Sequence, residues 1–392
     1  MLSGMLGLLL MAGGDSVGGP WRASLDLAGG ELRFSILIEG ETARLCNGPS
    51  CEEFSGLRWK GDSLVLELAD YAATVTAAHK GDSLLGYYRN LGRRGPRTIP
   101  FRASRGAWQM RNQAPAVLGR WDAWFESGFA STPRVLEIRA GPDGVTGAVI
   151  SNSGDAGLFW GEAAGDSIAI AHFDGSFVYL LTGRLEGDTL RGEFHAGLRS
   201  RTPFVATRSS GGAHLTPPTA ITKADTTPFG FSFPDLDGGT VSSTDERLKG
   251  KVVLVDIFGT WCPTCHDAAP TLVALYRDYR DRGLEIVGVA FEATGDTAHD
   301  AGLVRRYRQK HGIEFPLALG GVSEQEVVSA ALPQLVGFTA FPTTIFIGRD
   351  GRVRRIHAGF YGPATGAQHE ALVAEFRSVV ETLLADSGPK PH

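Results

Sequence analysis

Two cysteines separated by two residues are the side chains of this chain best suited to chemistry. Cys262 and Cys265 belong to the sequence Trp-Cys-Pro-Thr-Cys at 261–265. An apolar run at 252–258 predicts a buried strand before them, and the pattern at 263–282 predicts a helix after them. Cys262 then lies at a helix N-terminus, where unpaired N–H groups and the helix dipole favour an anion. Because the thiolate is the reactive form of cysteine, this arrangement predicts thiol–disulfide chemistry.

Thiol–disulfide exchange assigns a different role to each cysteine. Cys262 is expected at the exposed tip of the helix, where its thiolate attacks a disulfide and forms a mixed disulfide with the substrate. Cys265 lies one turn further into the helix and is expected to displace the substrate, which leaves a Cys262–Cys265 disulfide. Pro263 suits the first helical turn because it has no N–H group to satisfy. Together with Thr264, it is expected to contact the substrate and to tune the reduction potential.

The length and composition indicate a multidomain protein. The chain has 392 residues, of which 43% are hydrophobic and 21% charged, and its net charge is -5. This length favours two or three domains. The net charge is negative and the basic clusters are short and scattered, so we expect no nucleic-acid partner. The histidines show no metal-ligand spacing, and we expect neither a metal nor another cofactor.

Residues 18–209 are predicted to form strands. Short alternating apolar runs are broken by Gly, Asp, Asn and Ser turns, which is an all-β pattern. Several segments recur after 100 to 106 residues, among them Gly-Asp-Ser at 61–63 and 165–167, and Trp-x-Ala at 21–23 and 121–123. A repeat of this length indicates a duplicated structural unit.

Two tandem β units, at 18–108 and 109–209, are the predicted result. Each is expected to be a small antiparallel barrel or sandwich, with the Gly-Asp-Ser sequences as hairpin turns. The Gly-Arg-Trp sequence at 119–121 resembles the opening of ligand-binding up-and-down barrels, and a plain core tryptophan is the alternative. If the β units bind a partner, it is expected to be another protein or an apolar ligand.

A linker and a change of pattern follow the β units. Residues 210–226 are rich in Ser, Gly, Thr and Pro, which predicts a linker. Residues 227–388 alternate between strand and helix patterns, which indicates an α/β fold with a central sheet. The predicted strands lie at 252–258, 285–291, 315–319, 343–348 and 353–357. The predicted helices lie at 263–282, 297–311, 323–333 and 367–385.

The segment 227–386 resembles the TlpA/ResA-like family of thioredoxin-fold thiol–disulfide oxidoreductases. The matching parts are a lead-in strand, the entry to the central strand, the cysteine motif, a helix proline and two later loops: 231–238, 248–255, 261–265, Pro270, 341–344 and 350–353. The resemblance implies a thioredoxin-like fold with an additional β/α insertion at 292–335. The N-terminal β repeats lie outside it.

The resemblance also implies roles for residues around the cysteines. Pro342 is expected to be cis and to lie beside them, so that the backbone of Phe341 pairs with substrate as a short added strand. Trp261 is expected to shield the cysteines and to offer an apolar docking surface, with a plain core tryptophan as the alternative. Asp256 matches an acid that is buried behind the cysteines and handles the proton of the second thiol. Burial raises the pKa of such a carboxyl, and a hydrogen-bonded structural aspartate is the alternative.

One position departs from the family pattern. Members often carry Glu three residues after the second cysteine, where this chain has Ala268. The departure places more weight on Asp256 for proton transfer. His266, next to Cys265, is expected on the helix surface, and an effect on the local electrostatics is the alternative.

Cysteine usage and the N-terminus indicate an oxidising compartment. Residues 1–17 contain an apolar run that resembles a secretory signal peptide without its basic start, and a disordered N-terminus is the alternative. The four cysteines form two close pairs, as expected outside the cytosol. Cys46 and Cys51 flank turn residues and predict a hairpin with a structural disulfide, with two reduced thiols or a second redox pair as alternatives. We therefore expect a periplasmic, otherwise extracytoplasmic or secreted protein.

The leading functional hypothesis is an extracytoplasmic thiol–disulfide oxidoreductase that serves cell redox homeostasis. It is expected to reduce or exchange disulfides of protein substrates through Cys262 and Cys265, and to use a redox partner that can be membrane-bound. A peroxiredoxin-like peroxide reductase is the second hypothesis, although residues 259–261 lack the Pro and Thr spacing of that family. The third hypothesis makes the β units a binding module of the cell envelope, with the thioredoxin-like part as an accessory.

Overall fold

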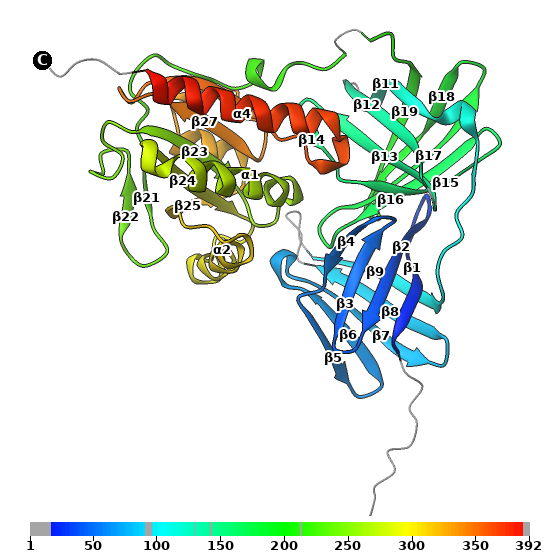
Figure 1. The fold of residues 1–392 in the computed structure, drawn as a ribbon. Coiled ribbons are helices and arrows are strands. Elements are labelled where there is room, and N and C mark those ends of the chain that lie inside the picture. The colour runs from blue at the N-terminus through cyan, green and yellow to red at the C-terminus, as the bar shows by residue number, and fades with distance from the viewer. Residues whose placement is uncertain (1–16, 91–95, 129, 142, 212–213, 387–392) are drawn as a thin grey trace, which may run out of the picture.

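The protein folds into two all-β units followed by an α/β unit (Figure 1). The expected multidomain architecture is therefore confirmed. The computed structural model describes residues 17–90, 96–128, 130–141, 143–211 and 214–386. The predicted signal peptide at 1–17 lies outside the described residues, apart from Val17.

The first β unit is an antiparallel sheet that does not close on itself. Its nine strands lie in the order β4-β3-β2-β1-β9-β8-β7-β6-β5, so β4 and β5 form the edges of a half-barrel. The strands are β1 (Gly19–Leu27), β2 (Gly30–Glu39), β3 (Thr42–Asn47), β4 (Ser50–Glu53), β5 (Gly56–Lys60), β6 (Ser63–Leu68), β7 (Ala73–Lys80), β8 (Ser83–Asn90) and β9 (Arg97–Arg105). A short 3₁₀ helix, η1 (Ala69–Tyr71), joins β6 to β7. Alternate apolar residues such as Leu32, Phe34 and Ile36 form its core.

The second β unit closes into a barrel. A pairing of β13 with β15 completes a ring of eight strands, to which the short strands β10 and β14 add. The strands are β10 (Asn112–Gln113), β11 (Gly119–Ser127), β12 (Ala130–Gly141), β13 (Gly144–Ser151), β14 (Gly154–Asp155), β15 (Phe159–Ala164), β16 (Ser167–Phe173), β17 (Val178–Glu186), β18 (Thr189–Ala196) and β19 (Ser200–Arg208). Trp121, Phe159 and Phe204 belong to the apolar cluster that fills the barrel.

The sequence repeat corresponds to the same construction in both units. In the first unit, Trp21 pairs across strands with Arg105, whose guanidinium lies 4.7 Å from the centroid of the tryptophan ring. In the second, Trp121 pairs with Arg208 in the same way, at 4.0 Å. In each unit the indole N–H donates to the backbone carbonyl four residues earlier. The tandem repeat predicted from the sequence is therefore a structural repeat.

The Gly-Asp-Ser sequences form two-residue hairpin turns. Gly61 lies between β5 and β6 with φ of +59°, and Gly165 lies between β15 and β16 with φ of +57°. Glycine suits these turns because positive φ angles carry a steric penalty for residues with a Cβ. The turns recur at equivalent places in the two units, which explains why these residues repeat.

The two β units share a core. Phe173, Val178 and Leu180 on β16 and β17 of the barrel belong to the same apolar cluster as Phe34 of the first unit. The rings of Phe34 and Phe173 lie 4.8 Å apart. The side chain of Asn47 donates to the carbonyl of Phe173 and accepts from its N–H. Because close-packed cores resist deformation, the two units are expected to move as one body.

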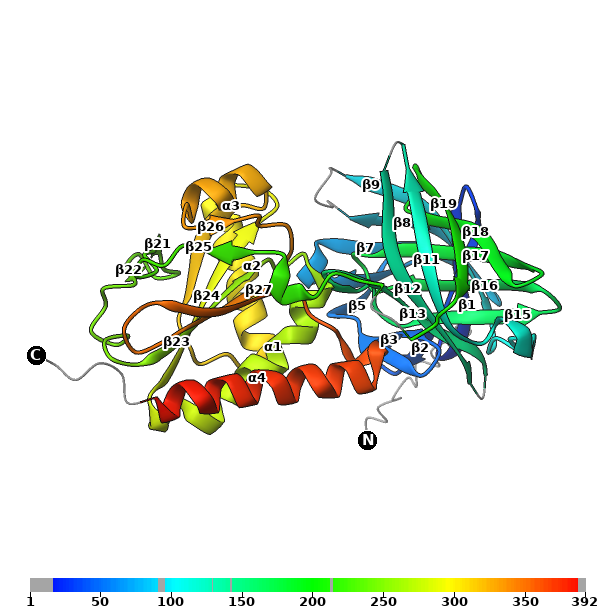
Figure 2. The same cartoon turned by 90° about the horizontal axis from the view of Figure 1, so that it is seen from above.

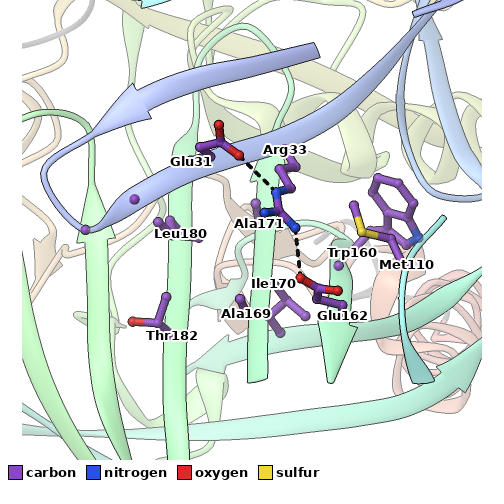
Figure 3. A pocket seen from close by; sticks show the side chains of 13 residues that line it. Glu31, Arg33, Met110, Trp160, Glu162, Ala169, Ile170, Ala171, Leu180 and Thr182 are labelled. Carbon is purple, nitrogen blue, oxygen red and sulfur yellow. Dashed lines mark hydrogen bonds and ion pairs between the residues drawn. The ribbon is translucent and has the colours of Figure 1, made fainter. Parts of the chain in front are cut away.

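A cavity of about 180 Å³ lies at this joint (Figure 3). Arg33 on β2 pairs with Glu31 on its own strand at 3.2 Å and with Glu162 on β15 at 2.9 Å. The lining also includes Met110 and Trp160 but no cysteine. The ion pairs tie β2 to the barrel wall, so this cavity belongs to the joint between the β units.

The C-terminal unit is a five-stranded sheet with helices on both faces. The strand order is β25-β24-β23-β27-β28, with β23 parallel to β24 and antiparallel to β27. The sheet strands are β23 (Val252–Phe258), β24 (Leu284–Glu292), β25 (Leu317–Val322), β27 (Thr343–Ile347) and β28 (Val353–Ala358). The short strands are β20 (Lys223–Ala224), β21 (Ser232–Pro234), β22 (Thr240–Ser242) and β26 (Leu335–Val336). The helices are α1 (Pro263–Tyr279), α2 (Thr297–His311), α3 (Gln325–Ala331) and α4 (Ala367–Ala385). The predicted α/β order is confirmed element by element. None of the described helices is both long and apolar enough to cross a membrane.

Alternation along the central strand β23 decides which face each side chain takes. Leu254 and Phe258 belong to the cluster that α1, α2 and α4 cover, whereas Val255 and Ile257 belong to the cluster under α3 and the β21–β22 hairpin. A strand covered on both faces is apolar throughout, as this one is apart from Asp256. By the same alternation, Asp256 points to the face that α1 covers.

The β units lie beside the C-terminal unit (Figure 2) and contact it around the start of α1. Lys310 on α2 pairs with Asp70 in η1 at 2.7 Å. The ring of Tyr71, in the same turn, packs edge-on against His266 at 5.3 Å. Gly154 of the barrel forms an isolated bridge with Phe360, which precedes α4. The first β unit therefore touches the helix that carries the cysteine motif, and the barrel touches the segment before α4.

Candidate functional site

The two cysteines lie where strand β23 passes into helix α1. Cys262 is the residue before the helix, and Cys265 lies in its first turn, with Pro263 at the first helical position. Both are free thiols, and the exposed fraction is 3% for Cys262 and 1% for Cys265. The Cys262 thiol donates to the backbone carbonyl of Phe341, with Sγ 3.6 Å from the oxygen. The motif thus forms the strand-to-helix junction that its spacing predicted.

The expected exposure of Cys262 is wrong. The barrel lies over the helix tip: the Ser176 hydroxyl donates to the carbonyl of Trp261 at 2.9 Å, and the Thr264 hydroxyl donates to the carbonyl of Asp155 at 3.5 Å. Exposure was inferred from the position of Cys262 at a helix end, which describes the C-terminal unit alone. The covering residues lie more than 80 positions earlier in the chain.

Asp256 lies on β23 beneath the start of α1. The carboxyl is 4% exposed and accepts a hydrogen bond from the Thr344 hydroxyl at 3.2 Å. Burial raises the pKa of Asp256 to about 7. Burial also raises the pKa of Cys265 well above its usual range, and the Cys262 thiol and the negative charge of Asp256 add to this effect. A carboxyl that titrates near neutrality therefore acts electrostatically on a thiol that holds its proton tightly.

The other predicted site residues gather around Cys262. The Phe341–Pro342 peptide bond is cis, as expected. The Trp261 indole donates to the carbonyl of Phe291 at 2.9 Å, and its ring packs edge-on against Phe341 with centroids 5.3 Å apart. Trp261 is partly buried and packs against the apolar cluster that contains both cysteines.

A cavity of about 520 Å³ separates the motif from the barrel. Trp261, Cys262, Thr264 and Phe341 line it from the C-terminal unit, and the opposite wall is formed by barrel residues. Four residues predicted to bind substrate or attack it therefore line the same pocket. No group of three or more His, Cys, Asp or Glu suited to a metal ion occurs among the described residues.

Glu292 is a site residue that the sequence reasoning missed. It is 1% exposed at the end of β24 and accepts from the N–H of Thr260 at 2.9 Å and from its hydroxyl at 2.7 Å. Burial raises the pKa of Glu292 to about 7. Thr260 lies two residues before Cys262, so Glu292 holds the backbone that leads into the motif. An acidic residue directly after the predicted strand at 285–291 was the only signal.

The expected surface position of His266 is also wrong. Its ring is buried between the two parts of the molecule, 4.8 Å from Tyr307 of α2 and 5.3 Å from Tyr71 of the first β unit. Its nitrogens lie 2.8 Å from His311 Nε2 and 2.9 Å from the carbonyl of Thr260. Burial lowers the pKa of His266 to about 3. A β unit covers the helix face that looked solvent-exposed in the sequence.

Two carboxyls meet at the contact between barrel and helix. Asp155 accepts from the N–H groups of Gly157 at 2.9 Å and Gly362 at 2.6 Å, and burial raises its pKa. Burial and the charge of Asp155 raise the pKa of Asp267 well above its usual range. Sequence reasoning missed both residues because their proximity depends on how the units pack.

Cys46 and Cys51 lie apart from this site. They face each other across the β3–β4 hairpin of the first β unit and form a disulfide. Neither residue lines the cavity that contains Cys262.

Comparison with known proteins places the C-terminal unit in a family. The Redoxin family model matches residues 222–370. The thiol-disulfide oxidoreductase ResA of Geobacillus thermodenitrificans is 30% identical over 145 residues, which cover 37% of this chain and 74% of the relative. The protein of the same name from Halalkalibacterium halodurans is 29% identical over 152 residues, which cover 38% of this chain and 73% of the relative.

One solved structure is similar to a comparable share of this chain. The thiol:disulfide interchange protein of the thioredoxin family from Chlorobium tepidum is 28% identical and covers 42% of this chain and 99% of that chain, with a TM-score of 0.32. For some other ResA relatives, the match spans 62% of the relative's length. The Redoxin match begins after the last barrel strand, so the β units lie outside it. Through its C-terminal unit, the chain belongs to the TlpA/ResA-like family of thioredoxin-fold thiol–disulfide oxidoreductases.

Proposed function

We propose that this oxidoreductase is an extracytoplasmic disulfide reductase or exchange enzyme that works through Cys262 and Cys265. The observation that carries the proposal is the layered arrangement at the start of α1. The Cys262 thiol faces a cavity beside the carbonyl of Phe341, and Cys265 and the high-pKa carboxyl of Asp256 lie behind it. This order supports a reaction in which Cys262 attacks from the cavity side and Asp256 accepts a proton from the protein side.

The proposed reaction transfers two electrons from the dithiol to a disulfide. The Cys262 thiolate attacks one sulfur of the substrate disulfide, so that a Cys262–substrate disulfide forms and the first substrate sulfur leaves as a thiolate. Cys265 then loses its proton and attacks Cys262 Sγ. The Cys262–Cys265 disulfide forms, and the second substrate sulfur leaves. Exchange in the reverse direction oxidises a substrate dithiol.

Asp256 is the proposed acceptor of the Cys265 proton. Because burial raises the pKa of Cys265 well above its usual range, this thiol attacks slowly unless a base takes its proton. The pKa of Asp256, raised to about 7, matches general-base catalysis near neutral pH. Ala268 stands where family members often carry Glu, which places more weight on Asp256 for this step.

Two features favour an extracytoplasmic location. The Cys46–Cys51 disulfide is of a kind that persists in oxidising compartments. The apolar sequence at 1–14 resembles the apolar core of a secretory signal, without its basic start. Under this proposal, the substrates include disulfides of exported proteins, and a redox partner restores the reduced dithiol.

The proposal is tested with insulin as a protein disulfide substrate and dithiothreitol as the reductant. The Cys262→Ser variant should lose reductase activity, while the matched Cys46→Ser/Cys51→Ser variant should retain it. A reduction potential of the Cys262–Cys265 pair near thioredoxin's ~-270 mV identifies a reductase, and a potential near ~-120 mV identifies an oxidant. Full activity of Cys262→Ser contradicts the proposal, as does rapid peroxide consumption in place of disulfide exchange.

A further inference from the structure

The cavity beside Cys262 is built largely from one end of the barrel. Phe125, Tyr179 and Phe194 contribute aromatic rings from three strands, and Phe341 closes the opposite side next to Cys262. Its volume of about 520 Å³ falls within the range of pockets that bind small molecules. The mouth of a β-barrel is a common place for such a pocket.

The cavity lining comes from interior positions of the barrel strands. Leu136 and Ile138 on β12 belong to the barrel core, so alternation places Arg134 inside the barrel as well, one step nearer the mouth. In the same way, Phe125 on β11 lies nearest the mouth, after Trp121 and Ala123. The cavity is therefore the upper end of the barrel interior, left unfilled where it faces Cys262.

Arg134 is the cation of this lining. Its guanidinium donates to the carbonyl of Pro133 at 2.8 Å and lies 6.0 Å from the ring centroid of Phe125. Among the described residues, no carboxylate forms an ion pair with Arg134, whereas the exposed Arg191 and Arg201 of the same barrel pair with glutamates. Burial lowers the pKa of Arg134. A half-buried cation without an anionic partner favours an anionic ligand.

The internal repeat shows which residue occupies the position of Arg134 in the first β unit. Arg134 pairs across strands with Ala123, and the equivalent pair in the first β unit is Phe34 with Ala23. Phe34 is 0% exposed and packs in the core of the first unit. A core phenylalanine in one copy thus corresponds to an arginine in the copy that faces the thiol.

Access to Cys262 also limits what can react there. The barrel covers the helix tip, and only 3% of Cys262 is exposed. Two exposed residues, Ser200 on β19 and Thr339 before Phe341, belong to the cavity lining, which indicates a route to solvent between them. A small disulfide can enter by this route, whereas a folded protein has to displace the barrel first.

We propose that the barrel is the substrate-binding part of this enzyme. The cavity takes a low-molecular-weight disulfide with an aromatic or apolar body and a carboxylate. Arg134 pairs with the carboxylate, the aromatic rings hold the body, and one sulfur reaches Cys262. This inference rests on the proposed function and names its substrate class.

The chemistry with such a substrate balances within the reduced enzyme. The Cys262 thiolate displaces one substrate thiolate and forms a mixed disulfide, and Cys265 displaces the second after its proton passes to Asp256. One small disulfide becomes two thiols, and the dithiol becomes the Cys262–Cys265 disulfide. A single turnover of the pre-reduced enzyme needs no other reductant.

The kinetic test compares two small aromatic disulfides with pre-reduced full-length protein. The dinitrobenzoate disulfide DTNB carries two carboxylates, and dithiodipyridine is uncharged at neutral pH. Arg134→Gln should lower the ratio of the DTNB rate constant to the dithiodipyridine rate constant by about tenfold or more, since it removes a charge-assisted hydrogen bond. Arg191→Gln, which removes an exposed arginine from the outside of the barrel, should leave this ratio unchanged.

A binding measurement separates recognition from chemistry. Isothermal titration of DTNB into the Cys262→Ser/Cys265→Ser protein should show one site, and Arg134→Gln in that background should weaken it by a similar factor. An unchanged rate ratio and unchanged binding in Arg134→Gln overturn the inference. A faster reaction with insulin than with either small disulfide, in the wild type and in Arg134→Gln alike, also overturns it.

The two proposals fail in different ways. If Cys262→Ser still reduces insulin and DTNB, the proposed function is wrong. If Cys262→Ser is inactive but Arg134→Gln behaves like the wild type in both tests, only the inference about the barrel is wrong.

Discussion

Replacing Asp256 by Asn should stabilise the protein while it slows the reaction. Burial raises the pKa of Asp256 to about 7, whereas an aspartate in an unfolded chain has a pKa near ~3.9. Between these two values the unfolded chain releases the Asp256 proton and the folded protein keeps it. The free energy of unfolding therefore falls as the pH rises through this window, and the loss levels off above pH ~7.

The size of the effect follows from the separation of the two pKa values. A separation of about 3 pH units corresponds to about 4 kcal/mol, and Asn avoids this cost because it carries no charge. The Asn amide oxygen can still accept the hydrogen bond from Thr344, which Asp256 accepts at 3.2 Å. The free energy of unfolding of the variant should match that of the wild type near pH ~4 and exceed it by up to about 4 kcal/mol at pH ~8.

The assay combines thermal unfolding with kinetics. The melting temperature of Asp256→Asn should exceed that of the wild type by up to about 10 °C at pH ~8, and the gap should close toward pH ~4. The rate of disulfide reduction should fall by about 100-fold, and the inflection near pH ~7 should disappear from the pH profile. Asp188→Asn, at an exposed hairpin turn, is the matched control and should change neither property. A variant with the wild-type pH profile refutes the assigned role of Asp256, and a pH-independent gap in melting temperature refutes the raised pKa.

Two further predictions concern the disulfide and the covering barrel. Cys46→Ser/Cys51→Ser should lower the free energy of unfolding by about 2 kcal/mol, because the bond closes a short loop, and should leave insulin reduction unchanged; loss of activity would indicate a redox role for this pair. In the native reduced protein, Cys262 should react with a polyethylene-glycol maleimide about tenfold more slowly than in the unfolded chain. The small reagent iodoacetamide should show a smaller difference in rate between the folded and unfolded states. Lys310→Asp opposes Asp70 of the first β unit with a like charge and should loosen this unit together with the barrel that shares its core, so the maleimide should react faster. Equal rates in all states would show that the β units do not restrict access.

The local pattern of the chain sufficed to predict the C-terminal unit. Its strands and helices carry the periodicities that their burial requires, and the apolar run at 252–258 is the central strand at the same bounds. The cysteine motif, Asp256 and the Phe-Pro sequence at 341–342 come together because the fold brings strand ends to one edge of the sheet. Local spacing and the resemblance were enough to find them.

The packing of the β units against the site could not be predicted. The burial of Cys262 under the barrel, the buried position of His266 and the contacts of the Asp155 carboxyl depend on residues far apart in the chain. The periodicity of a segment does not indicate which of its faces another segment will cover. Arg134 carried no signal either, since its unusual position appears only when the two structural repeats are compared.

The central claim is that Cys262 attacks a disulfide and Cys265 displaces the product, and a trapping experiment tests it most directly. Pre-reduced Cys265→Ser is mixed with DTNB, passed through a desalting column and analysed by intact mass and peptide mapping. The account predicts one stable adduct per chain on Cys262, whereas the wild type should release two thiols per chain and retain no adduct. An adduct on another residue, or a Cys265→Ser protein that releases both thiols as the wild type does, would contradict the account.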